Sequence, residues 1–164
     1  MSAHRVRLRR PRPGDLGRVV TLHGELYHRE FGYDHRFEAL VAGIVAEFAE
    51  RFDPRRERCW IAEMNGEVVG SVFLVRRSRT VAKLRLLVVH PKARGQGLGR
   101  RLTRACIRFA REKGYRKIML WTQSHLGAAR AIYQSEKFKL KSRERHFSFG
   151  KRLVAETWVL ALQP

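Results

Sequence analysis

Three glycines at alternate positions separate an apolar segment from an arginine-rich one. They are Gly95, Gly97 and Gly99, within the stretch VVHPKARGQGLGRRL. A helix leaves its first N–H groups without partners, and Ser, Thr, Asp or Asn usually accepts from one of them. Residues 94–98 include none of these types. Because glycine admits close approach to the backbone and a helix N-terminus attracts anions, the pattern predicts a phosphate-binding turn. A glycine-rich turn without a ligand is the alternative.

The spacing of these glycines excludes or disfavours two other phosphate motifs. The stretch does not match GxxxxGK[ST], so a P-loop is excluded. It reads GxGxG rather than GxGxxG, and it follows four predicted strands instead of the first one, which disfavours a dinucleotide-binding fold. Arg94, Arg100 and Arg101 would add positive charge to the site.

Hydrophobic periodicity predicts the elements that hold the glycines. A strand over 83–89 precedes them, a helix over 97–113 follows, and a second strand covers 117–122. Gly114 is placed to end the helix in a left-handed conformation. A strand, a helix and a strand in this order predict two parallel strands joined by a right-handed crossover.

The rest of the chain predicts antiparallel hairpins and further helices around this unit. Asn65-Gly66 and Phe149-Gly150 are the predicted hairpin turns, and Ser124 is the predicted cap of the last helix. The predicted strands cover 5–9, 59–64, 67–75, 140–147 and 155–162, and the predicted helices cover 16–27, 37–52 and 126–136. Together they give a mixed sheet with packed helices, in the α/β or α+β class, as one domain over residues 1–164.

Composition indicates a globular protein with an unusual charge. The chain has 164 residues, of which 44% are hydrophobic and 30% charged, and no apolar run approaches the length of a membrane span. The N-terminus lacks a secretion signal pattern, and Cys59 and Cys106 form neither a metal motif nor a disulfide framework, so we expect a cytoplasmic protein without a metal. Subtracting 15 acidic from 35 basic residues gives +20. Such a charge attracts polyanions, although a solvated basic surface without a specific partner explains it equally well.

A family resemblance adds to this interpretation. Arg94-x-x-Gly97-x-Gly99, after VHP, resembles motif A of the GCN5-related N-acetyltransferases (GNAT). The similarity continues through GYRKIMLWT to AARAIYQSEKF, where Tyr133 and Phe138 match aromatic positions of the family. Residues 23–162 are also similar to the acetyltransferase half of bacterial MarR–acetyltransferase fusion proteins, in phrases such as FDPRRERCWIAE and HFSFGKRLVAETW.

The resemblance implies a fold, a co-substrate and a site. The implied fold is a mostly antiparallel sheet with a central parallel βαβ unit and helices on both faces. Acetyl-CoA would donate an acetyl group to a primary amine on a small molecule or peptide, and Tyr133 would protonate the leaving thiolate. A bulge would separate the two parallel strands, and an N–H near Leu87 or Val88 would polarise the thioester. The implied cofactor-binding residues are Leu87, Val88, Val89, Arg94, Gly95, Gln96, Gly97, Leu98, Gly99, Arg100 and Ala129.

Two positions depart from the family pattern. Leu126 stands where many members have Asn, which removes a polar contact to coenzyme A. Lys137 stands where Gly often precedes the final Phe. A left-handed residue there would cost roughly 1–2 kcal/mol without glycine, so we expect a different turn.

Several roles stay open at this level. The general base is undecided among Glu25, Glu30, Glu63, Glu156 and His90. Core packing is expected for Trp60, Trp121 and Trp158, with cleft lining as the alternative, and Tyr133 has the alternative of a packed core aromatic. A positive cleft would favour acidic or carboxylate-bearing amines over polyamines.

Two functions without turnover compete with acetyl transfer: a basic module that binds nucleic acid or a protein partner, and a coenzyme A sensor. No helix-turn-helix or zinc-finger pattern occurs. In the fusion relatives the MarR part precedes this region, whereas almost nothing precedes it here, so DNA recognition is not expected. We also expect no membrane partner, and a homodimer is compatible with the resemblance.

Overall fold

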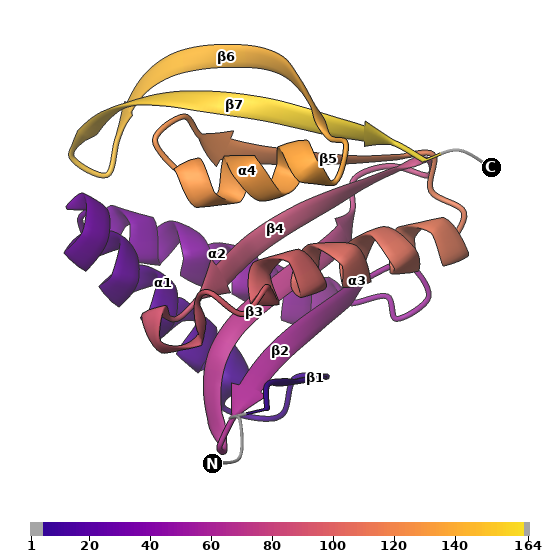
Figure 1. Cartoon of the computed structure of the whole chain (residues 1–164), viewed down its shortest axis with the longest axis horizontal. Helices are drawn as coiled ribbons and strands as arrows, with labels where there is room; N and C mark the ends of the chain where they lie inside the picture. Colours follow the sequence, from indigo (N-terminus) through magenta and orange to yellow (C-terminus); the bar gives the residue numbers. More distant parts are fainter. Residues whose placement is uncertain (1–4, 163–164) are drawn as a thin grey trace.

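The computed structural model describes residues 5–162, and the predicted elements are present with small shifts at their ends. A short 3-10 helix, η1, precedes the glycine turn (Figure 1). The elements in chain order are β1 (Arg7–Arg9), α1 (Asp15–Phe31), α2 (His35–Arg51), β2 (Arg58–Met64), β3 (Glu67–Arg76), β4 (Val81–Val89), η1 (Pro91–Ala93), α3 (Leu98–Glu112), β5 (Lys117–Gln123), α4 (Gly127–Ser135), β6 (Lys139–Ser148) and β7 (Lys151–Ala161).

One seven-stranded sheet contains all these strands, in the order β1-β2-β3-β4-β5-β7-β6. Among the strands of the described residues, only β4 and β5 pair in parallel, which confirms the βαβ unit. The Asn65-Gly66 turn has φ 52° and 79°, and the Phe149-Gly150 turn has φ 56° and 78°. Positive φ at both central residues matches the twist of a two-residue hairpin, which confirms both predicted turns.

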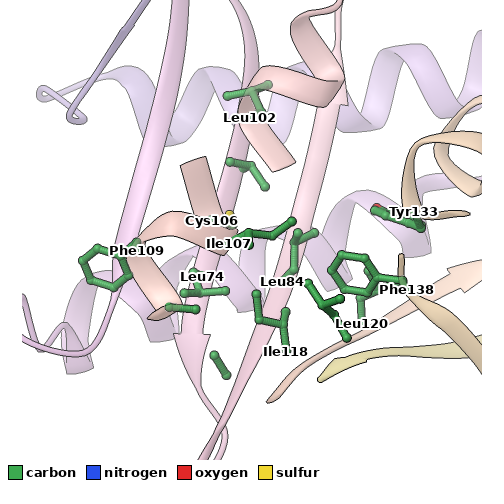
Figure 2. Packing of buried hydrophobic residues seen from close by; sticks show 14 of the residues in the cluster. Leu74, Leu84, Leu102, Cys106, Ile107, Phe109, Ile118, Leu120, Tyr133 and Phe138 are labelled. Carbon is green, nitrogen blue, oxygen red and sulfur yellow. The ribbon is translucent and has the colours of Figure 1, made fainter. Parts of the chain in front are cut away.

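Helices cover both faces of the sheet because the strands alternate their apolar residues between the two. On β2, Cys59 and Ile61 pack toward α1 and α2, whereas Ala62 and Met64 belong to the core under α3 and α4. Figure 1 shows α3 and α4 on the near side and α2 behind the sheet. Figure 2 shows the core under α3, where side chains of Leu102 and Cys106 meet those of the strands.

β4 and β5 diverge soon after they begin to pair. Their parallel register covers only residues 81–83 and 117–119. Further along β4, Leu86 has φ 53° and lies in a bulge opposite β3. The buried Ser71 hydroxyl donates a 2.9 Å hydrogen bond to the Leu86 carbonyl, which holds this strained conformation. The second half of β4 is therefore unpaired on the β5 side, as the resemblance implied.

The ends of α4 correct two expectations. Its N-terminus has no side-chain cap, so the predicted role of Ser124 is wrong; the Ser124 N–H instead donates to Val154 on β7 at 2.8 Å. At the other end Lys137 has φ 74°, so the left-handed turn is retained without glycine. The N–H of Phe138 bonds the Tyr133 carbonyl and that of Lys137 bonds the Gln134 carbonyl, at 2.9 and 3.1 Å. These two bonds form a Schellman motif, and they offset the cost of the left-handed lysine.

Within residues 5–162, no helix combines the length and the apolar character that crossing a bilayer requires. Cys59 and Cys106 are buried free thiols. Over the same residues, no three His, Cys, Asp or Glu side chains are grouped in a way that would hold a metal ion.

Candidate active site

The glycine turn exposes the N-terminus of α3. Gly95 and Gly97 have φ 77° and 73°, which L side chains rarely adopt. Gly97 is the N-cap residue and makes no side-chain capping bond, and the Arg101 N–H is the first to bond within the helix, to the Gly97 carbonyl at 3.0 Å. The N–H groups of residues 98–100 consequently have no side-chain cap, as the sequence predicted.

Gly99 has a different role from its two neighbours. A Cβ atom at this position would lie 2.7 Å from the Ile132 Cδ1 atom on α4. Glycine therefore lets α3 and α4 pack closely. On the outer side, Arg104 pairs with Glu136 at 2.6 Å and further ties the two helices together.

A cleft of about 570 Å³ opens beside this turn. Its floor is the unpaired end of β4, and its other walls come from α1 and from the start of α4. The predicted cofactor residues that line it are Leu87, Val88, Val89, Arg94, Gly95, Gly97, Leu98, Gly99, Arg100 and Ala129. Gln96 is exposed and does not line the cleft.

Arg94 closes one side of the cleft as a bridge. Its Nε donates to the Val89 carbonyl at 3.1 Å, and its Nη2 pairs with Glu30 Oε1 at 2.7 Å. The guanidinium thus connects the end of β4 to α1 while remaining about half exposed. It lies next to the uncapped amides and adds to their positive potential.

A second, smaller cavity of about 190 Å³ adjoins the first. The cleft and the cavity share four lining residues, Tyr27, Leu87, Leu126 and Ala129. The two hollows therefore lie on either side of the gap between β4 and β5. Tyr133 lines this second cavity and not the larger cleft. The site is therefore a cleft and a cavity that meet near Leu87.

Tyr133 is held at the edge of the core by the end of its own helix. Its ring centroid lies 5.6 Å from that of Phe138, the residue whose N–H closes the Schellman motif (Figure 2). The side chain is buried, and burial raises the pKa of its phenol far above the usual value. Tyr133 therefore keeps its proton at neutral pH, and its hydroxyl can donate a hydrogen bond or act as an acid.

His23 is a buried histidine of the second cavity that sequence reasoning missed. Its Nδ1 lies 2.8 Å from the Val19 carbonyl, which can only accept, so Nδ1 carries the proton. Its buried Nε2 has no hydrogen-bond partner among the described residues. Burial lowers the pKa of His23 to about 4, against the opposing effect of the Val19 carbonyl, and the ring is neutral at pH 7.

Lys83 and Arg85 are two cations of the same cavity that were also missed. Lys83 is 8% exposed, and its Nζ lies 3.6 Å from the centroid of the Trp121 ring. Burial, followed by repulsion from Arg85 and Arg77, lowers the pKa of Lys83 to about 8. Burial also lowers the pKa of Arg85. Two basic residues at alternate positions of an otherwise apolar strand were the available sequence signal.

The three tryptophans divide between core and cavity. Trp158 is 2% exposed, and Trp60 packs edge-on against Phe109, so core packing is confirmed for both. Trp121 lines the second cavity and is 58% exposed, so core packing was wrong there. The Lys83 ammonium packs against one face of the Trp121 ring in a cation–π contact, in place of the apolar contacts of a core.

The predicted general bases do not meet in the second cavity. Glu30 pairs with Arg94 at the cleft, Glu63 pairs with Arg9 at the β1 edge, and Glu25 is exposed. Glu156 is fully buried and accepts hydrogen bonds from Arg130, Arg143 and Trp158, at 2.8, 3.1 and 3.1 Å. The His90 Nδ1 accepts from the Lys92 N–H at 3.1 Å. None of these five residues lines that cavity.

Comparison with known proteins identifies the family. The model of the acetyltransferase (GNAT) family matches residues 23–138, which is more than half of the chain. The protein belongs to the GNAT family. This match includes the glycine turn and Tyr133, so the family resemblance noted from motif A is confirmed.

Among relatives of this GNAT protein, human N-acetyltransferase 8 is 33% identical over 117 residues, which cover 68% of this chain and 51% of that protein. The uncharacterized N-acetyltransferase YhfO of Bacillus subtilis is 26% identical over 137 residues, covering 80% and 89% of the two chains. The chain spans about half the length of the mammalian relatives it matches.

Solved structures show the same GNAT fold. The acetyltransferase yncA of Salmonella typhimurium, solved with its cofactor acetyl-CoA, matches with a TM-score of 0.78 at 20% identity, over 96% of this chain and 94% of that one. An acetyltransferase of Streptococcus agalactiae matches with a TM-score of 0.79 at 24% identity, over 96% and 98%. These matches confirm the predicted mixed sheet with its single parallel pair.

Proposed function

We propose that this GNAT protein transfers the acetyl group of acetyl-CoA directly to a primary amine. The observation that carries the proposal is the arrangement of the cleft, in which uncapped helix amides open beside an unpaired strand end. The uncapped helix amides suit a diphosphate, and the unpaired strand end suits an amide-containing chain that adds to a sheet edge. The acetyl-CoA bound to the similarly folded yncA protein supports this ligand.

Each part of the cleft has a separate task in this proposal. The amides of residues 95–100 bind the diphosphate, while Gly95 and Gly97 allow it to approach the backbone. The Arg94 N–H is not available, because it bonds the Pro91 carbonyl at 3.2 Å. The main chain of residues 87–89 binds the pantetheine arm, and Ala129 lines the opposite wall. An N–H at Leu87 or Val88 polarises the thioester carbonyl. Leu126 supplies only apolar contact, where many family members place an asparagine.

The reaction exchanges one bond for another. The amine nitrogen attacks the carbonyl carbon from the second cavity, a C–N bond forms, and the C–S bond breaks. The sulfur keeps the electron pair and takes a proton from Tyr133, which recovers one from solvent. The nitrogen loses its proton through water, because no carboxylate lines the cavity among the described residues. For a lysine-like amine this deprotonation costs about 4 kcal/mol at pH 7.4.

Two measurements test the proposal. Calorimetry should detect acetyl-CoA binding, and thiol release should require an added amine. Tyr133→Phe should slow turnover by roughly tenfold to a thousandfold at saturating substrates without weakening acetyl-CoA binding. Tyr115→Phe is the matched control, since its hydroxyl donates to the Arg56 carbonyl at 2.7 Å, outside both hollows.

The alternative functions give different outcomes. Acetyl-CoA binding without thiol release from any amine would indicate a coenzyme A sensor. Failure to bind acetyl-CoA would leave a basic binding module. The closer relation to the acetyltransferase half of MarR fusion proteins, a cytoplasmic location, a homodimer and the single-domain boundary at 1–164 all stay predictions.

A further inference from the structure

The second cavity contains two positive charges and no negative one. Lys83 and Arg85 project from alternate positions of β4 into it, and no Asp or Glu lines it among the described residues. Among the residues that the structure describes, neither cation has a carboxylate partner within 4 Å. A buried cation is costly unless a counter-charge accompanies it, so Lys83, which is buried, and Arg85, which is partly buried, would both gain from an anionic partner.

Lys83 and Arg85 also line a neighbouring hollow of about 390 Å³, together with Glu47, Asp53 and Glu57. These carboxylates have other partners, and Asp53 pairs with Arg55 at 3.4 Å. The charge of Glu47 on α2 raises the pKa of Arg85 against the larger effect of burial, but the Glu47 carboxylate forms its ion pair with Arg51, at 3.6 Å. Glu57 accepts from two backbone N–H groups, those of Asp53 and Arg76. Within residues 5–162, the Lys83 ammonium contacts the face of the Trp121 ring and no carboxylate within 4 Å. A ring face stabilises a cation less than a charged partner does.

The remaining walls of the cavity are mostly apolar or aromatic, with Thr122 and Gln123 as uncharged polar residues. Phe37, Trp121 and Phe149 belong to these walls, together with neutral His23. The volume of about 190 Å³ is below the roughly 300–1,000 Å³ typical of drug-sized ligands. The chemistry suits a small molecule with an apolar body and one anionic end.

We propose that the acceptor amine carries a carboxylate at its far end, and that Lys83 and Arg85 bind this carboxylate. The inference rests on the proposed acetyl transfer and names its substrate class. Arg85 is two residues from Leu87, where the cleft and the cavity meet. The separation along the strand is at most about 7 Å, because the bulge at Leu86 shortens it. An amine at the thioester and a carboxylate about this far away would occupy both ends of the cavity.

A matched pair of acceptors tests the subsite. 4-(Aminomethyl)benzoate and 4-(aminomethyl)benzamide share an aromatic body and an amine, and they differ in one charge. Thiol release should show a KM lower by about tenfold or more for the benzoate. Lys83→Met and Arg85→Met should each bring the ratio of the two KM values close to one, chiefly by raising the KM for the benzoate.

Lys117→Met is the control variant, because it removes an exposed cation from the adjacent strand outside both hollows and should keep the preference. Equal KM values for the two amines, or equal effects of the variants on both, would overturn the subsite while acetyl transfer stands. If neither amine releases thiol, acetyl transfer to this class fails. Calorimetric titration of both compounds in the presence of coenzyme A then still decides whether the two cations select the carboxylate.

Discussion

The cleft and the cavity on the two sides of the β4–β5 gap are built in different ways. The cleft takes its recognition groups from the backbone of one continuous segment, residues 87–100, with helices supplying apolar walls. The cavity takes its groups from side chains on separate elements: His23 on α1, Lys83 on β4, Trp121 on β5 and Tyr133 on α4. In the proposed function, the cleft binds acetyl-CoA, whose structure is always the same, and the cavity binds the acceptor amine, whose structure is set by the side chains that line it.

The difference also concerns stability. Uncapped amides at a helix N-terminus remain solvated in the absence of ligand and cost the fold little. The cavity instead holds a neutral buried histidine and a buried lysine, each with a pKa shifted by burial. His23 should reduce the stability of the folded protein as the pH falls, and the charged form of Lys83 should reduce it below pH 8. The cavity should therefore make stability depend on pH, whereas the cleft should not.

The largest expected effect is a loss of acetyl-CoA affinity in the cleft, in a pair of variants that differ in charge and not in size. Gly97→Asp should weaken acetyl-CoA binding about 100-fold, because the new carboxylate occupies the N-cap and repels the diphosphate. Gly97→Asn is the matched control: it has the same size, tolerates a left-handed conformation and carries no charge. A Cβ at this position meets no atom within 4 Å. Calorimetry measures acetyl-CoA affinity in both variants. An equal decrease in affinity would contradict an electrostatic contribution of the helix N-terminus to diphosphate binding.

The next effect belongs to the cavity at acid pH. The folded-state pKa of His23 is lowered to about 4, so the unfolded chain binds its proton first as the pH falls below 6.5. Stability should therefore decrease, and between pH 7.5 and pH 5 this residue accounts for about 2 kcal/mol. Urea unfolding of His23→Gln should show a correspondingly smaller acid loss. His35→Gln, at an exposed position, should keep the wild-type profile.

Lys83 predicts the opposite slope at alkaline pH. Its folded-state pKa is lowered to about 8, so the folded protein releases this proton before the unfolded chain does. Stability should rise by about 1.5 kcal/mol from this group between pH 7 and pH 9. Lys83→Met should lose that rise and be more stable than wild type at pH 7, whereas Lys117→Met should retain it. The same slope in Lys83→Met and wild type would rule out a buried ammonium.

The smallest effect concerns the turn that holds Tyr133 in the second cavity. Lys137→Gly should stabilise the protein by about 1 kcal/mol, because Lys137 has φ 74° and glycine adopts this conformation without strain. Lys139→Gly removes the same side chain from a strand and should destabilise by a similar amount. Thermal unfolding distinguishes the two. Equal decreases would show that the left-handed turn carries no cost.

The sequence predicted most of the cleft and little of the cavity. The glycines, the parallel βαβ unit and the cap at Gly114 depend on local spacing, and the structure contains all three. The core packing expected for Trp121 was wrong, because this residue is 58% exposed. The errors in backbone conformation were at Ser124 and Lys137, where contacts with β7 and Phe138 decide the backbone. Tertiary contacts outweigh local preference at such positions, because one or two hydrogen bonds match the free energy of a disfavoured dihedral.

By itself the sequence determined where a helix would begin without a cap, because backbone conformation near glycine depends on adjacent residues. Only the tertiary structure decided that His23, Lys83, Arg85 and Tyr133 would share one cavity. The divergence of β4 from β5 and the bulge at Leu86 open that space. A buried charge or a neutral histidine arises from desolvation, which depends on every element that covers the group.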